Sequence, residues 1–285
     1  MNGPLVLMVA VTCLWGTSSA LLATLAAPTT AGLVALGGAV PLLVWARLRG
    51  QHPWTTLTAH PALYFRLGGL EAANLALYVA ALRMGPLPVV VALHLTAPVL
   101  IIAAALVRGR RAPTLPVLVE LLLVGAAIWL VAWRHPGGDA QIAALTGCAL
   151  ALGSAACVAM LVSVVARHSG PDHTATSAAL QLLLGGIASS PLLVLDPPSG
   201  RVAAELAAIG ATLLGPGFAL YWLALRRLSA ATASVIGLNE AVVATLVGAV
   251  ATRSLPTAAT AAAGLLILIA AGLEQRSAPR HRVPP

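Results

Sequence analysis

The sequence predicts an all-α integral membrane protein with ten transmembrane helices, arranged as two inverted repeats of five helices each. Three observations predict this fold class. Of the 285 residues, 59% are hydrophobic and only 8% are charged, so the chain lacks the charged surface that a soluble fold of this size needs. Apolar runs of about 20 residues, the length that crosses a bilayer, recur along the chain. One segment also matches a later one at a fixed offset.

The apolar runs are expected to form helices, because a segment inside lipid must satisfy its backbone groups internally. A transmembrane barrel would show short alternating strands, a pattern that this sequence lacks. The eighth span is interrupted by Glu205 and by Gly215-Pro216-Gly217. The expected spans are residues 4–25, 31–48, 63–83, 87–107, 115–133, 142–166, 174–195, 203–226, 231–251 and 257–275.

The internal match aligns residues 76–113 with residues 219–256 without a gap, at an offset of 143 positions. Eleven of the 38 positions are identical. Matches of Ala, Leu or Val mean little in so apolar a chain, so rarer matches such as Tyr78 with Tyr221 carry the alignment. A self-match at a fixed offset indicates a duplicated unit. The expected units are residues 1–138 and residues 139–276, followed by a cytoplasmic tail over residues 277–285.

The distribution of arginines predicts the orientation. All 16 basic residues other than His are Arg, and a cytoplasmic N-terminus places twelve of them inside and four outside. This bias follows the positive-inside rule and predicts that both termini are cytoplasmic in a bacterial inner membrane. Five spans per half is an odd number, so the second half must cross the bilayer upside down. Many transporters obtain alternating access from such inverted repeats.

Several other protein classes are disfavoured. The pI of about 11 suggests nucleic-acid binding, but the arginines are scattered and no binding motif accompanies them. The N-terminal MNGP lacks the positive region of a signal peptide, so the run from Leu5 onward is expected to be a retained first span. The three cysteines, Cys13, Cys148 and Cys157, lie in apolar runs without metal-like spacing and are expected to be buried.

No cofactor or enzymatic activity is expected. The chain has no phosphate-binding glycine loop, so ATP bound to this chain would not drive it. Gly153-Ser154 superficially resembles an intramembrane serine protease, but the sequence indicates no His in a neighbouring span as a general base. The sequence therefore points away from hydrolysis and toward a carrier.

Three polar residues of the third span share one helical stripe. Glu71, Asn74 and Tyr78 are spaced at i, i+3 and i+7, which places them on the same face. A carboxylate inside a membrane costs about 2.5 kcal/mol or more unless it faces a cavity or a partner. The stripe is therefore a candidate for binding an ammonium or hydroxyl group. The alternative is a hydrogen-bonded cluster that locks neighbouring helices.

A second polar group is expected around the fourth and ninth spans. His94 and Thr96 precede Pro98, a residue that bends a helix and frees a backbone carbonyl. The 143-residue offset makes Asn239 and Glu240 the counterparts of Thr96 and Ala97. His94 can exchange a proton near neutral pH, although a structural hydrogen bond is the simpler role. Glu240 belongs either to a transport pathway or to the packing core.

Two further positions allow a functional and a structural interpretation. Trp15 of the first span either forms a cavity wall or packs between helices. Gln181 and the polar residues 174–177 of the seventh span stay ambiguous. Glu120 is expected near the inner interface, where it would pair with Arg110 or Arg111.

Three motifs resemble the drug/metabolite transporter superfamily with two EamA-type halves, and the resemblance covers nearly the whole chain. They are Trp15-Gly16-Thr17-Ser18, Leu95-Thr96-Ala97-Pro98 and Leu238-Asn239-Glu240-Ala241. Within that superfamily, residues 91–98 and 145–153 are similar to threonine/homoserine exporters. The resemblance implies export of small amino acids in exchange for protons.

Some positions depart from the pattern of those exporters. His94 stands where they usually carry Glu, and Ala241 stands where the superfamily has Pro. Arg110 and Arg253 replace an acidic residue of the usual helix exit. These departures affect the expected substrate rather than the expected fold.

The resulting hypothesis is an inner-membrane secondary transporter that exports a small metabolite by proton-coupled alternating access, with amino acids of the threonine/homoserine class as first candidates. The alternatives are an exporter of cationic drugs or another metabolite, and a non-transporting scaffold or sensor. The partners would be the solute, protons and the lipid bilayer, with a homodimer left open. The substrate candidates are Trp15, Glu71, Asn74, Tyr78, Thr96 and Asn239, and the proton-coupling candidates are Glu71, His94 and Glu240.

Overall fold

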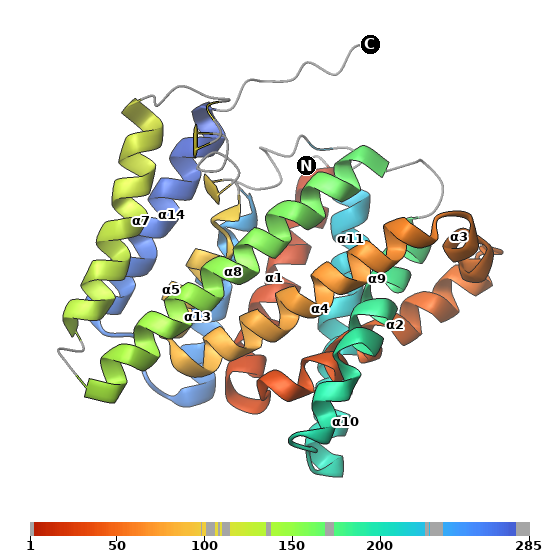
Figure 1. The fold of residues 1–285 in the computed structure, drawn as a ribbon. Helices are drawn as coiled ribbons and strands as arrows, with labels where there is room; N and C mark the ends of the chain where they lie inside the picture. The colour runs from red at the N-terminus through yellow and green to blue at the C-terminus, as the bar shows by residue number, and fades with distance from the viewer. Residues whose placement is uncertain are drawn as a thin grey trace.

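The computed structural model describes residues 3–97, 99–100, 106–107, 109, 115–134, 138–168, 174–225, 228 and 236–277. Within these ranges the secondary structure consists of helices and turns without a β-strand, which confirms the all-α class (Figure 1). Glu120, Pro98, Arg110 and Arg111, about which the sequence made predictions, lie outside the described residues or side chains.

Most helices begin and end close to the expected spans. The longer helices are α1 (Gly3–Leu25), α2 (Ala31–Leu48), α4 (Pro61–Met84), α5 (Leu87–His94), α7 (Leu115–Arg134), α8 (Gly138–His168), α9 (Thr174–Ser189), α10 (Gly200–Ile209), α11 (Gly215–Leu225), α13 (Asn239–Thr252) and α14 (Ala258–Ser277). The shorter elements are the 3₁₀ turns η1 (Pro28–Thr30) and η2 (Ser190–Val194), the π-helical turn η3 (Gly210–Leu214) and α3 (Pro53–Ala59), which the sequence analysis did not predict.

The helices have the length and surface of membrane spans. In the part of the chain that the structure describes, five helical stretches are long and apolar enough to cross a bilayer. Large apolar side chains also cover the outside, including Val44, Phe65 and Leu246, which are 55%, 64% and 63% exposed. Such a surface suits lipid rather than water. The chain is therefore a multi-pass membrane protein, while the count of ten spans stays a prediction. The five stretches are Gly3–Leu25, Pro28–Leu48, Gly138–Val165, Ala175–Val194 and Gly200–Ala224.

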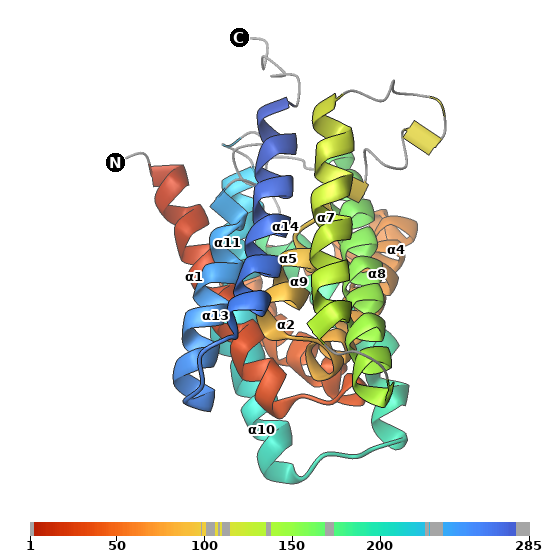
Figure 2. The ribbon, with the colours of Figure 1, turned by 90° about the vertical axis from the view of Figure 1, so that its left-hand side faces the viewer.

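Pairs of helices far apart in sequence form the bundle. α7 and α14 pack side by side at one flank (Figures 1 and 2). α4 packs against α8 and α9, and α11 packs against α1 and α2. A shift of 143 positions places α8 over α1, α9 over α2 and the α10–α11 segment over α4. The same helix pairing thus occurs once for each half of the chain.

Two helices are interrupted at corresponding positions. α5 ends at His94 and is followed by a turn at Leu95 and Thr96, while α13 is preceded by a turn at Leu238. The offset of 143 places Leu95 on Leu238. In the first half, the turn at Leu95 and Thr96 comes just before Pro98, the residue at which the sequence predicted a bend. Interrupted helices in matching places of two halves are a feature of transporter binding sites.

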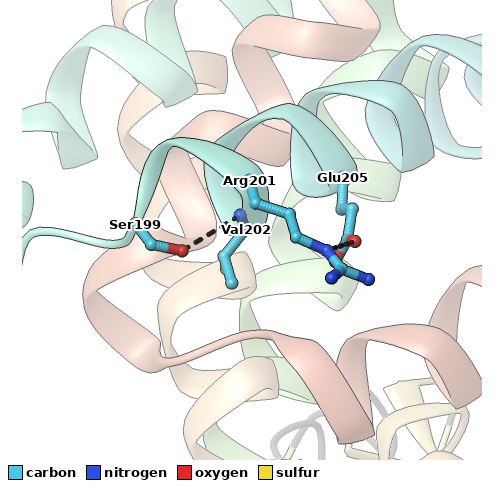
Figure 3. Close-up of polar contacts among 4 residues, drawn as sticks. All are labelled: Ser199, Arg201, Val202 and Glu205. Carbon is cyan, nitrogen blue, oxygen red and sulfur yellow. Dashed lines mark hydrogen bonds and ion pairs between the residues drawn. The ribbon is translucent and has the colours of Figure 1, made fainter.

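The polar start of the eighth span is accommodated by local contacts. Ser199 caps α10 by accepting a hydrogen bond from the Val202 backbone N–H at 3.4 Å (Figure 3). Arg201, two residues after Ser199, pairs with Glu205 one turn further along α10, with Arg201 Nε 2.8 Å from Glu205 Oε1. This i, i+4 ion pair explains how a carboxylate fits at the start of the span. Its exposed position makes its contribution to stability small.

Close helix contacts depend on glycine in the same region. A Cβ atom on Gly210 would overlap the Val34 carbonyl oxygen and lie 2.8 Å from Gly38 N. η3 therefore approaches α2 backbone to backbone, as small residues permit in membrane proteins.

Of the three cysteines, Cys148 and Cys157 are buried as expected, whereas the expectation is wrong for Cys13, which lies on the exposed face of α1.

Candidate transport site

A cavity of about 180 Å³ lies between helices of both halves of the chain. A single water needs about 10–15 Å³ of such space, so the cavity has room for a small solute. Of the residues that the structure describes, twenty-five line it, from α1, α4, α5, α8, α9, α11, α13 and neighbouring turns. Six of the eight residues that the sequence predicted for the site are among them: Trp15, Glu71, Asn74, Tyr78, His94 and Glu240.

The lining follows the internal repeat. Eighteen of the 25 lining residues form nine pairs whose numbers differ by 143. The pair Tyr78 and Tyr221 keeps the same residue type, whereas Glu71 is matched by Leu214. The backbone positions around the cavity therefore repeat, but the polar groups do not. The nine pairs are 15/158, 18/161, 19/162, 22/165, 71/214, 75/218, 78/221, 94/237 and 97/240.

Glu240 forms one polar corner of the cavity. It lies in the first turn of α13 and is only 4% exposed. Ser19 donates a hydrogen bond to Glu240 Oε1 at 3.4 Å, and Tyr78 donates from its hydroxyl to Ser19 Oγ at 2.8 Å. Gly16 lets α1 approach this turn, because a Cβ there would lie 2.8 Å from the Glu240 carbonyl oxygen. Among the described residues, the carboxylate thus accepts a hydrogen bond from one hydroxyl group, and it lies beside the cavity.

His94 takes part in a second polar group with residues of α4 and α8. Ser154 donates to Asn74 Oδ1 at 2.7 Å, and its oxygen lies 2.8 Å from His94 Nδ1. A hydroxyl has one proton, so the second contact requires that His94 Nδ1 carries the hydrogen. The imidazole ring also packs on Tyr78, with ring centroids 4.4 Å apart. The contacts with Ser154 and Tyr78 therefore fix the orientation of the His94 ring between the Glu240 group and the Asn74–Ser154 group.

Ser154 contacts His94, because α5 packs directly against α8. The sequence indicated no His in a neighbouring span as a general base for Ser154, so this contact was not predicted. The pair is nevertheless unsuited to nucleophilic attack. Ser154 has no exposed surface, does not line the cavity, and directs its proton to Asn74 rather than to the imidazole. A nucleophile needs access to its substrate and a base that accepts its proton.

Replacing Ser154 with Ala is expected to lower the stability of the protein by about 1–3 kcal/mol, since it removes the hydrogen-bond partner of the buried Asn74 Oδ1 and of the half-buried His94 Nδ1. A thermal unfolding curve of the purified variant measures this. Thr146→Ala is the matched control on the same helix, because the Thr146 hydroxyl bonds only to the Ile142 carbonyl of α8 in the described contacts. Equal unfolding temperatures for the two variants would contradict the structural role of Ser154.

Glu71 forms the third polar group, across the α4–α9 interface. Gln181 Nε2 donates to Glu71 Oε2 at 2.7 Å, and the two side chains are 2% and 0% exposed. The other oxygen of each residue, Glu71 Oε1 and Gln181 Oε1, has no hydrogen-bond partner in the described structure. Both residues line the cavity. The ambiguous Gln181 is thus a member of the site.

An aromatic wall faces these polar groups. Trp15 packs against Phe218 and Tyr221, with ring centroids 5.2 and 5.1 Å apart. Its indole N–H donates to the Leu214 carbonyl at the end of the π-helical turn, at 3.5 Å. Gly217 makes room for the ring, since a Cβ there would lie 2.6 Å from Trp15 Cδ1. Trp15 therefore forms part of the cavity wall as well as a packing contact.

Thr96 and Asn239 lie outside the cavity lining. Thr96 is buried and donates to the Leu93 carbonyl at 2.6 Å, which satisfies one carbonyl at the end of α5. The Asn239 side chain is exposed. A contact of either residue with a solute in the cavity would need a different conformation, so their substrate-binding role stays a prediction.

The sequence analysis missed several residues of the site. Tyr221 and Phe218 are second-half counterparts of Tyr78 and Leu75, so the 143-residue offset was a usable signal. Ser19 follows Trp15 by four positions and therefore shares its helix face. Gln181 and Ser154 were named from the sequence, but their contacts could not be predicted, since their partners lie 110 and 80 residues away.

Comparison with known proteins agrees with this architecture. Residues 145–273 match the model of the EamA-like transporter family. The chain therefore contains an EamA-like transporter domain. This EamA domain covers α9, α10, α11, α13, most of α8 and most of α14, so it supplies Gln181, Tyr221 and Glu240 to the cavity.

Curated relatives of this chain are exporters by name. The threonine/homoserine exporter RhtA of Escherichia coli K12 is 32% identical over 134 residues, which is 46% of this chain and 41% of RhtA. RhtA of Escherichia coli O157:H7 gives the same figures. The match therefore spans less than half of these relatives.

A solved crystal structure extends the likeness to nearly the whole chain. It aligns with a TM-score of 0.62 at 21% sequence identity and covers 95% of this chain and 96% of the other. At this identity the likeness concerns the fold alone.

Proposed function

We propose that this protein is a secondary transporter that exports a small metabolite from a bacterial cell by proton-coupled alternating access, with threonine and homoserine as the first candidate substrates. The observation that carries the proposal is the cavity, which is lined by equivalent positions of both halves and by two buried carboxylates. A cavity between two halves can open to either side when the halves rock against each other.

The repeat that this mechanism needs is part of the proposal. It consists of residues 1–138 and residues 139–276 in opposite orientations, with both termini cytoplasmic. The helix pairing and the nine pairs of lining positions support the duplication. α1 begins and α14 ends at the same end of the bundle, as an even number of spans requires (Figure 2).

Proton coupling is proposed because both carboxylates are buried next to apolar side chains. An ionised carboxylate in such a place is unfavourable unless it has partners, so it tends to take up a proton or a cation. Among the described residues, Glu240 accepts a hydrogen bond from the Ser19 hydroxyl, and Glu71 interacts with the amides of Gln181 and Asn74. A carrier that must close around them is therefore expected to exchange solute for protons.

Transport into everted membrane vesicles tests the proposal. Labelled threonine or homoserine is expected to accumulate when a proton gradient, acid inside, is imposed, and to equilibrate without it. Vesicles from cells that lack the protein provide the background. Uptake that is the same with and without the gradient would contradict proton coupling.

A second candidate substrate class is favoured by the aromatic wall. Trp15, Tyr221 and Phe218 offer flat faces that attract organic cations. An exporter of cationic drugs would use the same fold and the same carboxylates. Proton-driven uptake of ethidium into the everted vesicles, in place of amino-acid uptake, would select this candidate. A non-transporting scaffold is the weaker alternative, because both carboxylates line a cavity between the two halves of the chain.

A further inference from the structure

Glu71 and Gln181, two residues of the cavity lining, have a pair of unused hydrogen-bond acceptors. One oxygen and one nitrogen of the pair are bonded to each other, which leaves Glu71 Oε1 and Gln181 Oε1 without a hydrogen-bond partner among the described residues. Both side chains are almost fully buried. Buried polar atoms in folded proteins nearly always have a partner, so two unpaired acceptors on adjoining residues indicate a missing donor.

The helices hold these two side chains together. Gly68 and Gly185 lie at the crossing of α4 and α9, where a Cβ on Gly185 would lie 3.0 Å from Glu71 Cβ. A Cβ on Gly68 would overlap Leu184. The close approach places Glu71 against Gln181 and limits the rotamers of both. The packing of α4 against α9 therefore holds the two acceptors in place.

The charge of the cavity selects the kind of donor. Among the described residues, two carboxylates, Glu71 and Glu240, line it and no Arg does, and the chain contains no Lys. His94 is the remaining titratable cation among the described lining residues, and its Nδ1 is engaged with Ser154. The lining therefore attracts positive charge and offers none for an anion.

A metal ion fits the acceptor pair poorly. Ca²⁺ takes six to eight oxygen ligands and Mg²⁺ takes six in a strict octahedron. Among the described residues, no group of three His, Cys, Asp or Glu side chains is placed to hold a metal. An ammonium group instead carries three N–H donors, which suits two nearby acceptors and one further contact within the cavity.

We infer that Glu71 and Gln181 bind a primary ammonium group of the transported solute, through Glu71 Oε1 and Gln181 Oε1. This inference rests on the proposed function and narrows its substrates to compounds with a primary amine. It also divides the two carboxylates, because Glu71 holds the solute while Glu240, with its single hydroxyl partner, is left for the proton. The aromatic wall would contact the apolar part of the solute.

Calorimetric titration of the whole protein in lipid nanodiscs tests this site with n-butylammonium as the probe. Empty nanodiscs correct for partition into lipid. Binding to the wild-type protein is expected, and binding at least about tenfold weaker is expected for Glu71→Gln and for Gln181→Met, since each removes charge or an acceptor. Butyltrimethylammonium, which has the same charge but no N–H, is expected to bind at least about tenfold more weakly than n-butylammonium.

Ser189→Ala is the matched control on α9, because the Ser189 hydroxyl is buried but bonds to the Gly185 carbonyl of its own helix and lies outside the cavity lining. It is expected to bind n-butylammonium as the wild type does. Should Gln181→Met fail to fold, the comparison of the two ammonium probes on the wild type decides alone.

Three outcomes would overturn the inference. The absence of heat with n-butylammonium would mean that the acceptors hold only a proton or a water. Equal or tighter binding of butyltrimethylammonium would assign cation recognition to the aromatic wall. Unchanged affinity in Gln181→Met would remove Gln181 from the site. Failure of threonine transport with intact n-butylammonium binding would instead overturn the proposed transport function and leave the ammonium site in place.

Discussion

Glu240→Gln is expected to lower gradient-driven accumulation of threonine or homoserine at least about tenfold, because an amide cannot take up and release the proton that drives the exchange. The amide has nearly the same shape, and its oxygen can still accept from Ser19, which donates to Glu240 in the wild type. Folding should therefore be preserved. The measurement is uptake into everted vesicles with an imposed proton gradient.

Glu205→Gln provides the matched control for this substitution. It makes the same chemical change on the exposed carboxylate of α10, which is paired with Arg201 and lies outside the cavity lining. Accumulation is expected to stay at the wild-type level. Gradient-driven accumulation by Glu240→Gln at the same level as by Glu205→Gln would show that Glu240 belongs to the packing core alone.

Gly210→Ala is expected to destabilise the protein by about 3 kcal/mol or more, which is the upper end of overpacking effects. The new methyl group would meet the backbone of α2 at Val34 and Gly38. Backbone atoms cannot rotate away as a side chain can, so α2 and η3 would have to separate. The unfolding temperature of the purified protein and its yield in membranes both measure the loss.

Gly69→Ala tests whether the effect comes from the contact or from the residue type. Gly69 lies in α4, and a Cβ there would have nothing within 4 Å. Ala favours a helix over Gly by about 1 kcal/mol, so this variant is expected to be neutral or slightly more stable. Similar losses for Gly210→Ala and Gly69→Ala would contradict the close contact between η3 and α2.

Much of the fold could be predicted from local pattern, because membrane helices are specified by apolar runs of fixed length. The same periodicity correctly placed Glu71, Asn74 and Tyr78 on one buried face. The bounds of α5 and α13 were predicted less well. A helix break inside an apolar run leaves the hydropathy almost unchanged, so the turns at Leu95 and Leu238 have no strong sequence signal.

The site could be predicted only where one helix or the repeat supplied the signal. The sequence does not decide which of the adjacent residues Asn239 and Glu240 faces the cavity, and the structure buries Glu240 and leaves Asn239 exposed. The bonds from Ser154 to His94 and from Gln181 to Glu71 join helices that are distant in sequence. Such contacts depend on how the helices cross, which residue spacing along one chain segment does not encode.

The mismatch of residue types within the nine lining pairs has an energetic consequence. If rocking exchanges the conformations of the two halves, the inward-open and outward-open forms have similar backbones. They differ in their polar groups, because neither Glu71 nor Glu240 is matched by a carboxylate at the equivalent position of the other half. The two forms then differ in free energy, and a difference of a few kcal/mol leaves about 0.1–10% of molecules in the minor form. The empty protein is therefore expected to rest with its cavity open mainly to one side of the membrane, so that solutes on that side have the first access to the site.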